Sequence, residues 1–325
     1  MTNDQPFELE GARVWVAGHR GMVGSAIVRR LEREDREILT VERADLDLID
    51  QAATNRWIRA SRPDVVFLAA AKVGGILAND RYPADFLYDN LMVEANVIRA
   101  CLETGVKKLV FLGSSCVYPK SAPQPISESA LMTGPLEPTN EPYAIAKIAG
   151  LKLVTACRRQ HGADYISLMP TNLYGPNDNF DLETCHVVPA LLRKVHEARR
   201  DGSDRVVIWG SGSPRREFLH VDDLADACVF LARTWSGDEP INVGTGADCT
   251  IGELAGLIRE VVGWSGEFVF DANRPDGTPR KLLDVSRLTR LGWAPKIRLE
   301  EGLAQTYAWY LANAGTVRGA AAPAL

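Results

Sequence analysis

A doubly wound parallel α/β sheet, followed by a smaller mixed α/β domain, is the fold that this sequence of 325 residues predicts. Short apolar runs alternate with helical patterns through the first half, as they do when strands lie parallel and helices cover both faces. A glycine-rich loop joins the first apolar run to the first helical pattern. After about residue 175 the alternation becomes irregular, which indicates a second domain of different construction.

The composition excludes several classes of protein. Hydrophobic residues make up 46% and charged residues 24%, and the net charge is −5, so no nucleic-acid partner is expected. No run of 18 apolar residues occurs, and the first residues lack the basic and apolar regions of a signal peptide, so we expect no membrane partner. The six cysteines are widely spaced without a C-x-x-C pair. This argues against disulfides and a metal site and predicts a cytoplasmic protein.

The first strand is expected at residues 13–17 and the first helix at 25–31, with Gly18, Gly21 and Gly24 between them. In dinucleotide-binding loops such glycines permit a tight turn, close approach of the backbone to a pyrophosphate, and packing of helix on strand. The N-terminus of the helix then attracts the phosphates. A glycine-rich turn without function is the alternative, but the strand–loop–helix context favours a nucleotide.

The second strand, at residues 37–41, ends at Glu42 and Arg43. An acid at this place holds the ribose 2′-hydroxyl of NAD, whereas an arginine accommodates the 2′-phosphate of NADP. Arg20 in the glycine loop is a second cation nearby, and two arginines against one glutamate favour NADP. The alternative is that Glu42 and Arg43 only form a solvated strand end.

Further strands and helices complete a sheet of the Rossmann type. Loops as long as the Pro- and Ser-rich segment at 119–142 are often functional. The strands are expected at residues 63–71, 107–112 and 165–169, and the helices at 85–101 and from 143 to about 160. We expect residues 1–174 to form the dinucleotide-binding domain.

Residues 175–325 are expected to form mainly a substrate-binding domain, although the chain is expected to return to the first domain around residues 217–245. The last residues, 316–325, are rich in Ala and Gly and are expected to be frayed. Helices are expected at residues 187–199, from residue 221 and at residues 252–262. Strands are expected at residues 205–210, just before residue 221 and from residue 241, and a charged loop is expected at residues 274–281.

Ser114, Tyr143 and Lys147 form a pattern suited to carbonyl reduction. When hydride adds to a carbonyl carbon, a proton must reach the oxygen, and tyrosine alone is a poor acid with a pKa near 10. A lysine four residues later lies one helical turn away, where its ammonium stabilises the phenolate and should lower that pKa. Ser114 would bond the substrate oxygen. Two ordinary helix residues are the alternative for Tyr143 and Lys147 in isolation.

Longer strings of residues are specific to a known family. The chain resembles the GDP-L-fucose synthases, which belong to the extended short-chain dehydrogenase/reductase superfamily, from about residue 13 to about residue 312. The strings that carry the resemblance are residues 18–25 (Gly-His-Arg-Gly-Met-Val-Gly-Ser), 113–120 (Gly-Ser-Ser-Cys-Val-Tyr-Pro-Lys), 137–147, 169–176, 216–223 and 275–281.

The resemblance implies an NADPH-dependent epimerase-reductase that converts GDP-4-keto-6-deoxy-D-mannose to GDP-L-fucose. Carbons C3 and C5 are inverted first, and the C4 ketone is then reduced. Tyr143, Lys147 and Ser114 would act in the reduction, with Cys116 as the base and His186 as the acid of the epimerisations. A small core residue is the alternative for Cys116, and a neighbour of a helix N-terminus is the alternative for His186.

The resemblance also implies binding residues and a homodimer. Helices at 85–103 and 143–160 would form the dimer interface. Lys194, Trp209, Arg216, Asp276 and Lys281 would contact the GDP-sugar, although exposed surface residues are the alternative, above all for Lys194. The NADP(H) site would consist of Gly18, His19, Arg20, Gly21, Met22, Val23, Gly24, Arg43, Leu112, Gly113, Ser114, Ser115, Lys147, Pro170, Thr171, Asn172, Leu173 and His186.

The rival functions fall into two classes, another nucleotide-sugar enzyme of the same superfamily and a non-catalytic NADP-binding sensor. A nucleotide-sugar 4,6-dehydratase would carry an Asp-Glu pair where Ser115 and Cys116 stand, and a simple 4-epimerase needs no thiol base. A non-catalytic NADP-binding sensor would be expected to lack Tyr143 or Lys147, and both are present. Consumption of NADPH with the keto-sugar would separate these functions.

Overall fold

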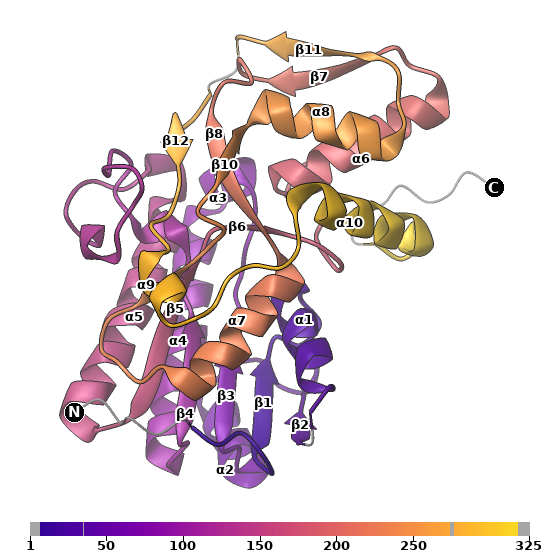
Figure 1. Cartoon of the computed structure of the whole chain (residues 1–325). Coiled ribbons are helices and arrows are strands. Elements are labelled where there is room, and N and C mark those ends of the chain that lie inside the picture. Colours follow the sequence, from indigo (N-terminus) through magenta and orange to yellow (C-terminus); the bar gives the residue numbers. More distant parts are fainter. Residues whose placement is uncertain (1–6, 35, 274–275, 318–325) are drawn as a thin grey trace.

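The computed structural model describes residues 7–34, 36–273 and 276–317, and it has the predicted doubly wound sheet (Figure 1). Six parallel strands lie in the order β2-β1-β3-β4-β5-β9. Arg274 and Pro275 of the charged loop and residues 318–325 of the expected tail lie outside the described residues. The six strands are β1 (Arg13–Ala17), β2 (Glu37–Leu39), β3 (Val65–Leu68), β4 (Lys108–Leu112), β5 (Asp164–Pro170) and β9 (Ile241–Val243).

Helices cover both faces of this sheet because side chains on both faces are apolar. Along β3, Val65 and Phe67 join one buried cluster and Val66 and Leu68 the other, as the two-residue period of a strand requires. One face is covered by α1 (Met22–Leu31) and α7 (Val221–Thr234), and the other by α2 (Gln51–Ser61), α4 (Pro83–Thr104) and α5 (Glu141–His161).

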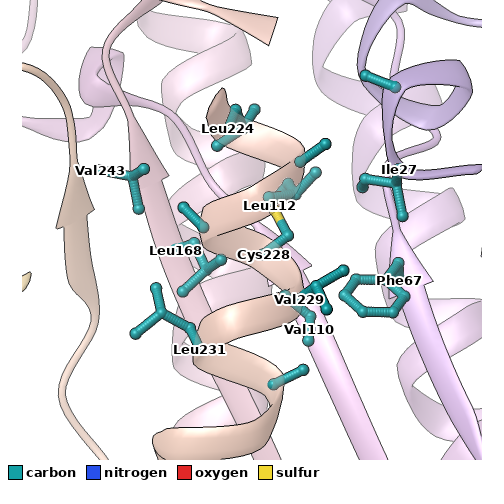
Figure 2. Packing of buried hydrophobic residues seen from close by; sticks show 14 of the residues in the cluster. Ile27, Phe67, Val110, Leu112, Leu168, Leu224, Cys228, Val229, Leu231 and Val243 are labelled. Carbon is teal, nitrogen blue, oxygen red and sulfur yellow. The ribbon is translucent and has the colours of Figure 1, made fainter. Parts of the chain in front are cut away.

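Figure 2 shows the first of these two clusters, where α7 lies across the sheet. Leu224, Cys228 and Leu231 of α7 pack with Phe67 of β3 and Leu168 of β5. Val243 of β9 belongs to the same cluster. A helix and a strand from the second half of the chain are therefore part of the first core.

The remaining elements form a second lobe, in the upper part of Figure 1, with its own apolar cluster. Phe180, Leu192, Ile208, Leu254 and Tyr310 lie in this cluster. The elements are β6 (Asn172–Tyr174), α6 (Val187–Asp201), β7 (Arg205–Trp209), β8 (Arg215–His220), β10 (Asp248–Thr250), α8 (Ile251–Val262), β11 (Glu267–Asp271), β12 (Arg280–Lys281) and α10 (Leu299–Asn313). Helix α9 (Ser286–Arg290) instead packs against β9, with Leu288 in the first cluster, and α3 (Ile76–Arg81) precedes α4.

Two small sheets organise the second lobe. Strand β8 pairs with β10, β12 and β6, and β7 pairs in parallel with β11. Because β6 directly follows β5 and β12 carries Lys281, the β8 sheet links the C-terminal edge of the large sheet to the predicted substrate residues.

The structure corrects several expected boundaries. The strand expected at 63–71 ends at Leu68, and residues 69–75 leave the sheet in an irregular segment. Helix α2 was not expected from the sequence, because only Thr54 and Ile58 are fully buried on it and the apolar stripe is weak. Helix α10 was also not expected, although Leu303, Tyr307 and Tyr310 follow helical spacing.

Candidate active site

The glycine loop lies at the point of the sheet where the strand order reverses, between β1 and β3. Gly18 has a φ of +85°, and a Cβ there would stand 2.8 Å from the backbone of Ala70, just after β3. A Cβ on Gly24 would stand 2.1 Å from the Gly18 carbonyl oxygen. Gly21 is the N-cap residue of α1, has an extended backbone and makes no side-chain capping hydrogen bond. The first turn of α1 contains no acidic residue. These features fit the pyrophosphate of a dinucleotide.

The end of β2 carries the groups expected at the adenosine ribose. Glu42 Oε1 lies 2.7 Å from Arg20 Nη2 and 3.3 Å from His19 Nε2. Arg43 is exposed beside them. Because Arg20 pairs with the one acid that would repel a 2′-phosphate, this edge suits NADP better than NAD.

The ends of β4 and β5 bring the two remaining cofactor stretches, 112–115 and 170–173, together. The Gly113 amide donates to the Leu168 carbonyl at 2.8 Å, and a Cβ on Gly113 would meet Met169 Sδ at 2.7 Å. Thr171 and Asn172 both donate side-chain hydrogen bonds to the carbonyl of Glu217. The end of β5 is thereby joined to β8 of the second lobe.

Ser114, Tyr143 and Lys147 meet where β4 ends and α5 begins. Ser114 Oγ accepts the Cys116 amide at 3.2 Å, and a hydrogen bond links Ser114 to the Tyr143 hydroxyl. Lys147 Nζ lies 5.9 Å from the centre of the Tyr143 ring. The structure thus gathers the three residues that the sequence analysis assigned to reduction.

The expected lowering of the Tyr143 pKa is not found in the protein alone. Burial raises this pKa above its ordinary value of 10, and the nearby Cys116 and Glu94 raise it further. The Lys147 ammonium lies near this ring and is paired with Glu94 at 2.9 Å. Tyr143 therefore stays protonated and can act as a proton donor.

Two donors meet at the sulfur of Cys116. Asn140 Nδ2 lies 3.4 Å from Sγ, and Lys281 Nζ lies 3.6 Å from it. A hollow lined by Cys116, Asn140, Thr278 and Lys281 opens beside the thiol. An ammonium and an amide aimed at the same sulfur stabilise negative charge there, which is the form that a thiol base needs.

His186 is the N-cap residue of α6, yet its side chain makes no capping hydrogen bond. The imidazole is exposed, and the surrounding protein lowers its pKa below the ordinary 6.5. Cys185 beside it is partly buried, and burial raises its pKa to about 12, so this thiol stays protonated. The Gly75 amide donates to the Thr184 carbonyl at 2.8 Å, which places the segment after β3 beside these residues.

The predicted substrate residues lie on several elements of the second lobe. Lys194 of α6 donates to the Val207 carbonyl at 3.4 Å, and its Nζ lies 5.7 Å from the centre of the Trp209 ring. Arg216 of β8 is half-buried, and burial lowers its pKa. The carboxylate of Asp276 accepts both the amide and the hydroxyl of Ser211.

Sequence analysis missed two residues that contact the central group. Asn140 lies one helical turn before Tyr143, and that spacing could have indicated it. Glu94 pairs with Lys147, and its position one helical turn before the buried Val97 and Ile98 of α4 was a signal for a buried charge.

The described part of the chain lacks both a membrane-spanning helix and a metal-binding cluster. No helix in residues 7–34, 36–273 and 276–317 is long and apolar enough to cross a membrane. In the same residues no group of three His, Cys, Asp or Glu side chains could hold a metal ion.

Comparisons with known proteins agree with this geometry. The model of the "NAD dependent epimerase/dehydratase family" matches residues 14–244. The chain is 60% identical to "GDP-L-fucose synthase 1" of Arabidopsis thaliana, with 94% of each chain covered. It is 58% identical to the "GDP-L-fucose synthase" of Escherichia coli K12, with 94% of this chain and 99% of that one covered.

A solved structure of a GDP-L-fucose synthetase from Naegleria fowleri bound to NADP is similar with a TM-score of 0.90 and 30% identity, covering 98% of this chain and 100% of that one. The fold, the glycine loop and the near full-length identities therefore agree, and the chain belongs to the NAD-dependent epimerase/dehydratase family and, within it, to the GDP-L-fucose synthases.

Proposed function

We propose that this protein converts GDP-4-keto-6-deoxy-D-mannose to GDP-L-fucose as an NADPH-dependent epimerase-reductase. The observation that carries the proposal is the position of Cys116. Its thiol meets the side chains of Asn140 and Lys281 and follows directly on Ser114 and Ser115, beside Tyr143. A carbon base next to the group that holds a ketone oxygen is needed for epimerisation and not for simple reduction.

The cofactor is NADP(H), and the residues present fit it. A Cβ would fill the cradle at Gly18 and Gly24, and Arg20 neutralises Glu42 at the ribose end. Residues 18–24, Arg43, 112–115, Lys147, 170–173 and His186 would hold it. When bound, NADPH supplies the hydride that C4 receives.

Cys116 and His186 carry the epimerisations in this proposal. The Cys116 thiolate takes the proton from C3 or C5, so a C–H bond breaks and an S–H bond forms. The electron pair moves to the C4 oxygen, where Tyr143 and Ser114 stabilise it by hydrogen bonds. His186, once protonated, then gives its proton to the opposite face of the same carbon, and its lowered pKa makes that proton easier to release.

Tyr143 completes the reduction by giving its phenolic proton to the C4 oxygen. Its raised pKa keeps the proton on the phenol until the alkoxide forms, because an alkoxide is a far stronger base. Lys147 stabilises the phenolate that remains.

The substrate is a GDP-sugar, and the proposed contacts come from the second lobe. The partly buried cation of Arg216 suits a diphosphate because arginine binds it through two parallel hydrogen bonds. Lys194, Trp209, Asp276 and Lys281 are proposed to contact the rest of the nucleotide sugar. Lys194 and Trp209 already contact each other, which makes them one candidate subsite.

We further propose a cytoplasmic homodimer through α4 and α5. The six cysteines are free, as in a reducing compartment. Tyr88 and Leu91 on α4 and Ile145 on α5 are apolar and exposed, at 57%, 36% and 45%. Exposed apolar side chains on two neighbouring helices support association through that face.

Product identification by NMR tests the function directly. The wild-type protein with NADPH and the keto-sugar should yield GDP-L-fucose, with slower turnover on NADH. In heavy water without reduction, Cys116→Ser should slow deuterium exchange at C3 and C5 by at least about 100-fold, because the base is lost. Tyr143→Phe should abolish reduction and leave measurable exchange.

The function would be wrong if NADPH binds tightly but the keto-sugar is not turned over. Reduction without inversion at C3 and C5 would indicate a plain 4-reductase. Exchange at the wild-type rate in Cys116→Ser would remove the thiol from the role of base.

A further inference from the structure

Glu94 is a buried carboxylate that the mechanism so far does not use. It lies in the middle of α4 and is only 1% exposed. Burial of an isolated carboxylate is costly unless a cation or several hydrogen bonds compensate it. Its position on the apolar stripe that faces α5 therefore requires a reason.

The compensating group is the catalytic lysine itself. Lys147 Nζ lies 2.9 Å from Glu94 Oε1, and both side chains are at most 3% exposed. Among the described residues, no other hydrogen-bond donor meets the carboxylate. Lys147 Nζ also donates to the Leu112 carbonyl at 3.0 Å. Since an ammonium has three N–H groups, one remains for a ligand.

Helix α5 has space for this carboxylate because residue 150 is glycine. A Cβ on Gly150 would stand 2.4 Å from Glu94 Oε2 and 2.5 Å from the Phe111 ring. Gly150 lies three residues after Lys147, on the same side of α5. The lysine and the space for its partner are therefore encoded on neighbouring turns of one helix.

We propose that Glu94 is a positioning residue for the C4 reduction, holding the charged Lys147 against the end of β4 so that its ammonium faces Tyr143. This inference rests on the proposed function. When Tyr143 gives up its proton, the phenolate needs a cation nearby. Without Glu94 the buried ammonium has no counter-charge, so it loses its proton or turns toward solvent, and in both cases the phenolate loses its support.

The competing explanation is that Glu94 only joins α4 to α5. A double-mutant cycle separates the two, because residues that act through each other are not additive. Glu94→Gln should lower kcat for reduction by about 10- to 100-fold, with KM for the GDP-sugar changed less than about 3-fold. The double variant Glu94→Gln/Lys147→Met should be no slower than Lys147→Met alone.

Two companion variants sharpen the test. Glu94→Asp keeps the charge and should retain more activity than Glu94→Gln, and it also serves if the glutamine variant does not fold. Asp164→Asn is the matched control, because it removes the carboxylate 2.8 Å from the equally buried Lys108 at the opposite end of β4. It should lower thermal stability and leave kcat of the folded protein unchanged.

Three results would overturn the inference: reduction at the wild-type rate in Glu94→Gln, multiplying losses in the double variant, or equal rates in the Asp and Gln variants. Each of these requires a wild-type protein that reduces the keto-sugar. If the wild type itself does not reduce it, the proposed function fails instead, and the two failures are distinguishable.

Discussion

At the scale of single residues, the environment of Cys116 decides whether a thiol can act as a carbon base. The sequence analysis placed Lys281 at the sugar nucleotide, whereas the structure brings its ammonium to 3.6 Å from the Cys116 sulfur. The two residues are 165 positions apart, so no local pattern could predict the contact. By contrast, the Tyr143–Lys147 relation follows from one helical turn and was predictable.

Replacing Lys281 tests this contact. Lys281→Met removes the cation beside the sulfur, so deuterium exchange at C3 and C5 should slow by at least about 10-fold at saturating GDP-sugar. Exchange is measured by NMR or mass spectrometry. Lys281→Arg keeps a cation and should retain more of the rate. A raised KM with unchanged exchange at saturation would show instead that Lys281 serves only to bind the nucleotide.

Asp178, in the segment before His186, is expected to make stability depend on pH. Burial raises the pKa of Asp178 to about 7, and its Oδ2 has no hydrogen-bond partner among the described residues. A carboxyl group whose pKa is raised on folding favours the folded state at low pH, and this contribution is lost as the pH rises from about 4 to about 7.

Asp178→Asn mimics the protonated acid and should remove this dependence. From pH 5 to pH 8 the wild type should lose on the order of 2–3 kcal/mol of unfolding free energy relative to the variant. Urea unfolding at the two pH values measures the difference. The exposed Asp204 provides the control, because Asp204→Asn should leave the wild-type pH dependence in place. Parallel pH curves for wild type and Asp178→Asn would contradict the expectation.

At the scale of elements, the sequence predicts those helices along which buried apolar residues recur from end to end. Helices α4 and α5 were expected within a few residues of their bounds, because buried residues recur along both at helical spacing. Helix α2 was missed because only Thr54 and Ile58 are fully buried on it, so that its buried stripe is short. Strand β3 ends at Leu68, and the segment after it passes so close to Gly18 that a Cβ there would stand 2.8 Å from the Ala70 backbone. No periodic pattern in the sequence predicts this close approach.

Adding one methyl group at Gly24 tests whether the close contact between α1 and the glycine loop is needed. In Gly24→Ala the added carbon would stand 2.1 Å from the Gly18 carbonyl oxygen, so α1 must move away from β1. We expect a loss of about 1–3 kcal/mol in stability and at least about 10-fold weaker NADPH binding, measured by calorimetry.

The matched control is Gly256→Ala in α8, where a Cβ would meet nothing within 4 Å. Because alanine favours helix over glycine, this variant should gain about 0.5–1 kcal/mol and bind NADPH normally. Normal NADPH binding in Gly24→Ala would show that the close approach of α1 is not needed for the cofactor.

At the scale of the whole molecule, the exposed apolar face of α4 and α5 predicts the state of association. Leu91→Glu combined with Ile145→Glu places two charges on that face, so the protein should become monomeric in light scattering after gel filtration. Leu311→Glu is the control, because Leu311 is 48% exposed and belongs to α10, a helix of the second lobe. A wild-type monomer, or a double variant that stays dimeric, would rule out this interface.

The assignment of elements to lobes is also a property of the whole molecule. Sequence patterns predicted the first five strands of the sheet and a further strand from residue 241, which in the structure is β9 beside β5. The division at residue 174 stays a prediction, since α7 and β9 belong to the first core while α6 and α8 belong to the second. The return expected around residues 217–245 spans α7 and β9, but α9 also lies in the first core, and the loosened pattern after residue 175 gave no sign of that.

The place of β9 limits how this gene can be recombined with those of its relatives. A single crossover near residue 175 would join one parent's β5 to another parent's β9 and α7, so their buried side chains would have to match by chance. Exchange of the second lobe alone requires at least three junctions, one before β6 and one on each side of the segment that carries α7 and β9. Chimaeras with altered sugar specificity should therefore be built as insertions and not as simple head-to-tail fusions.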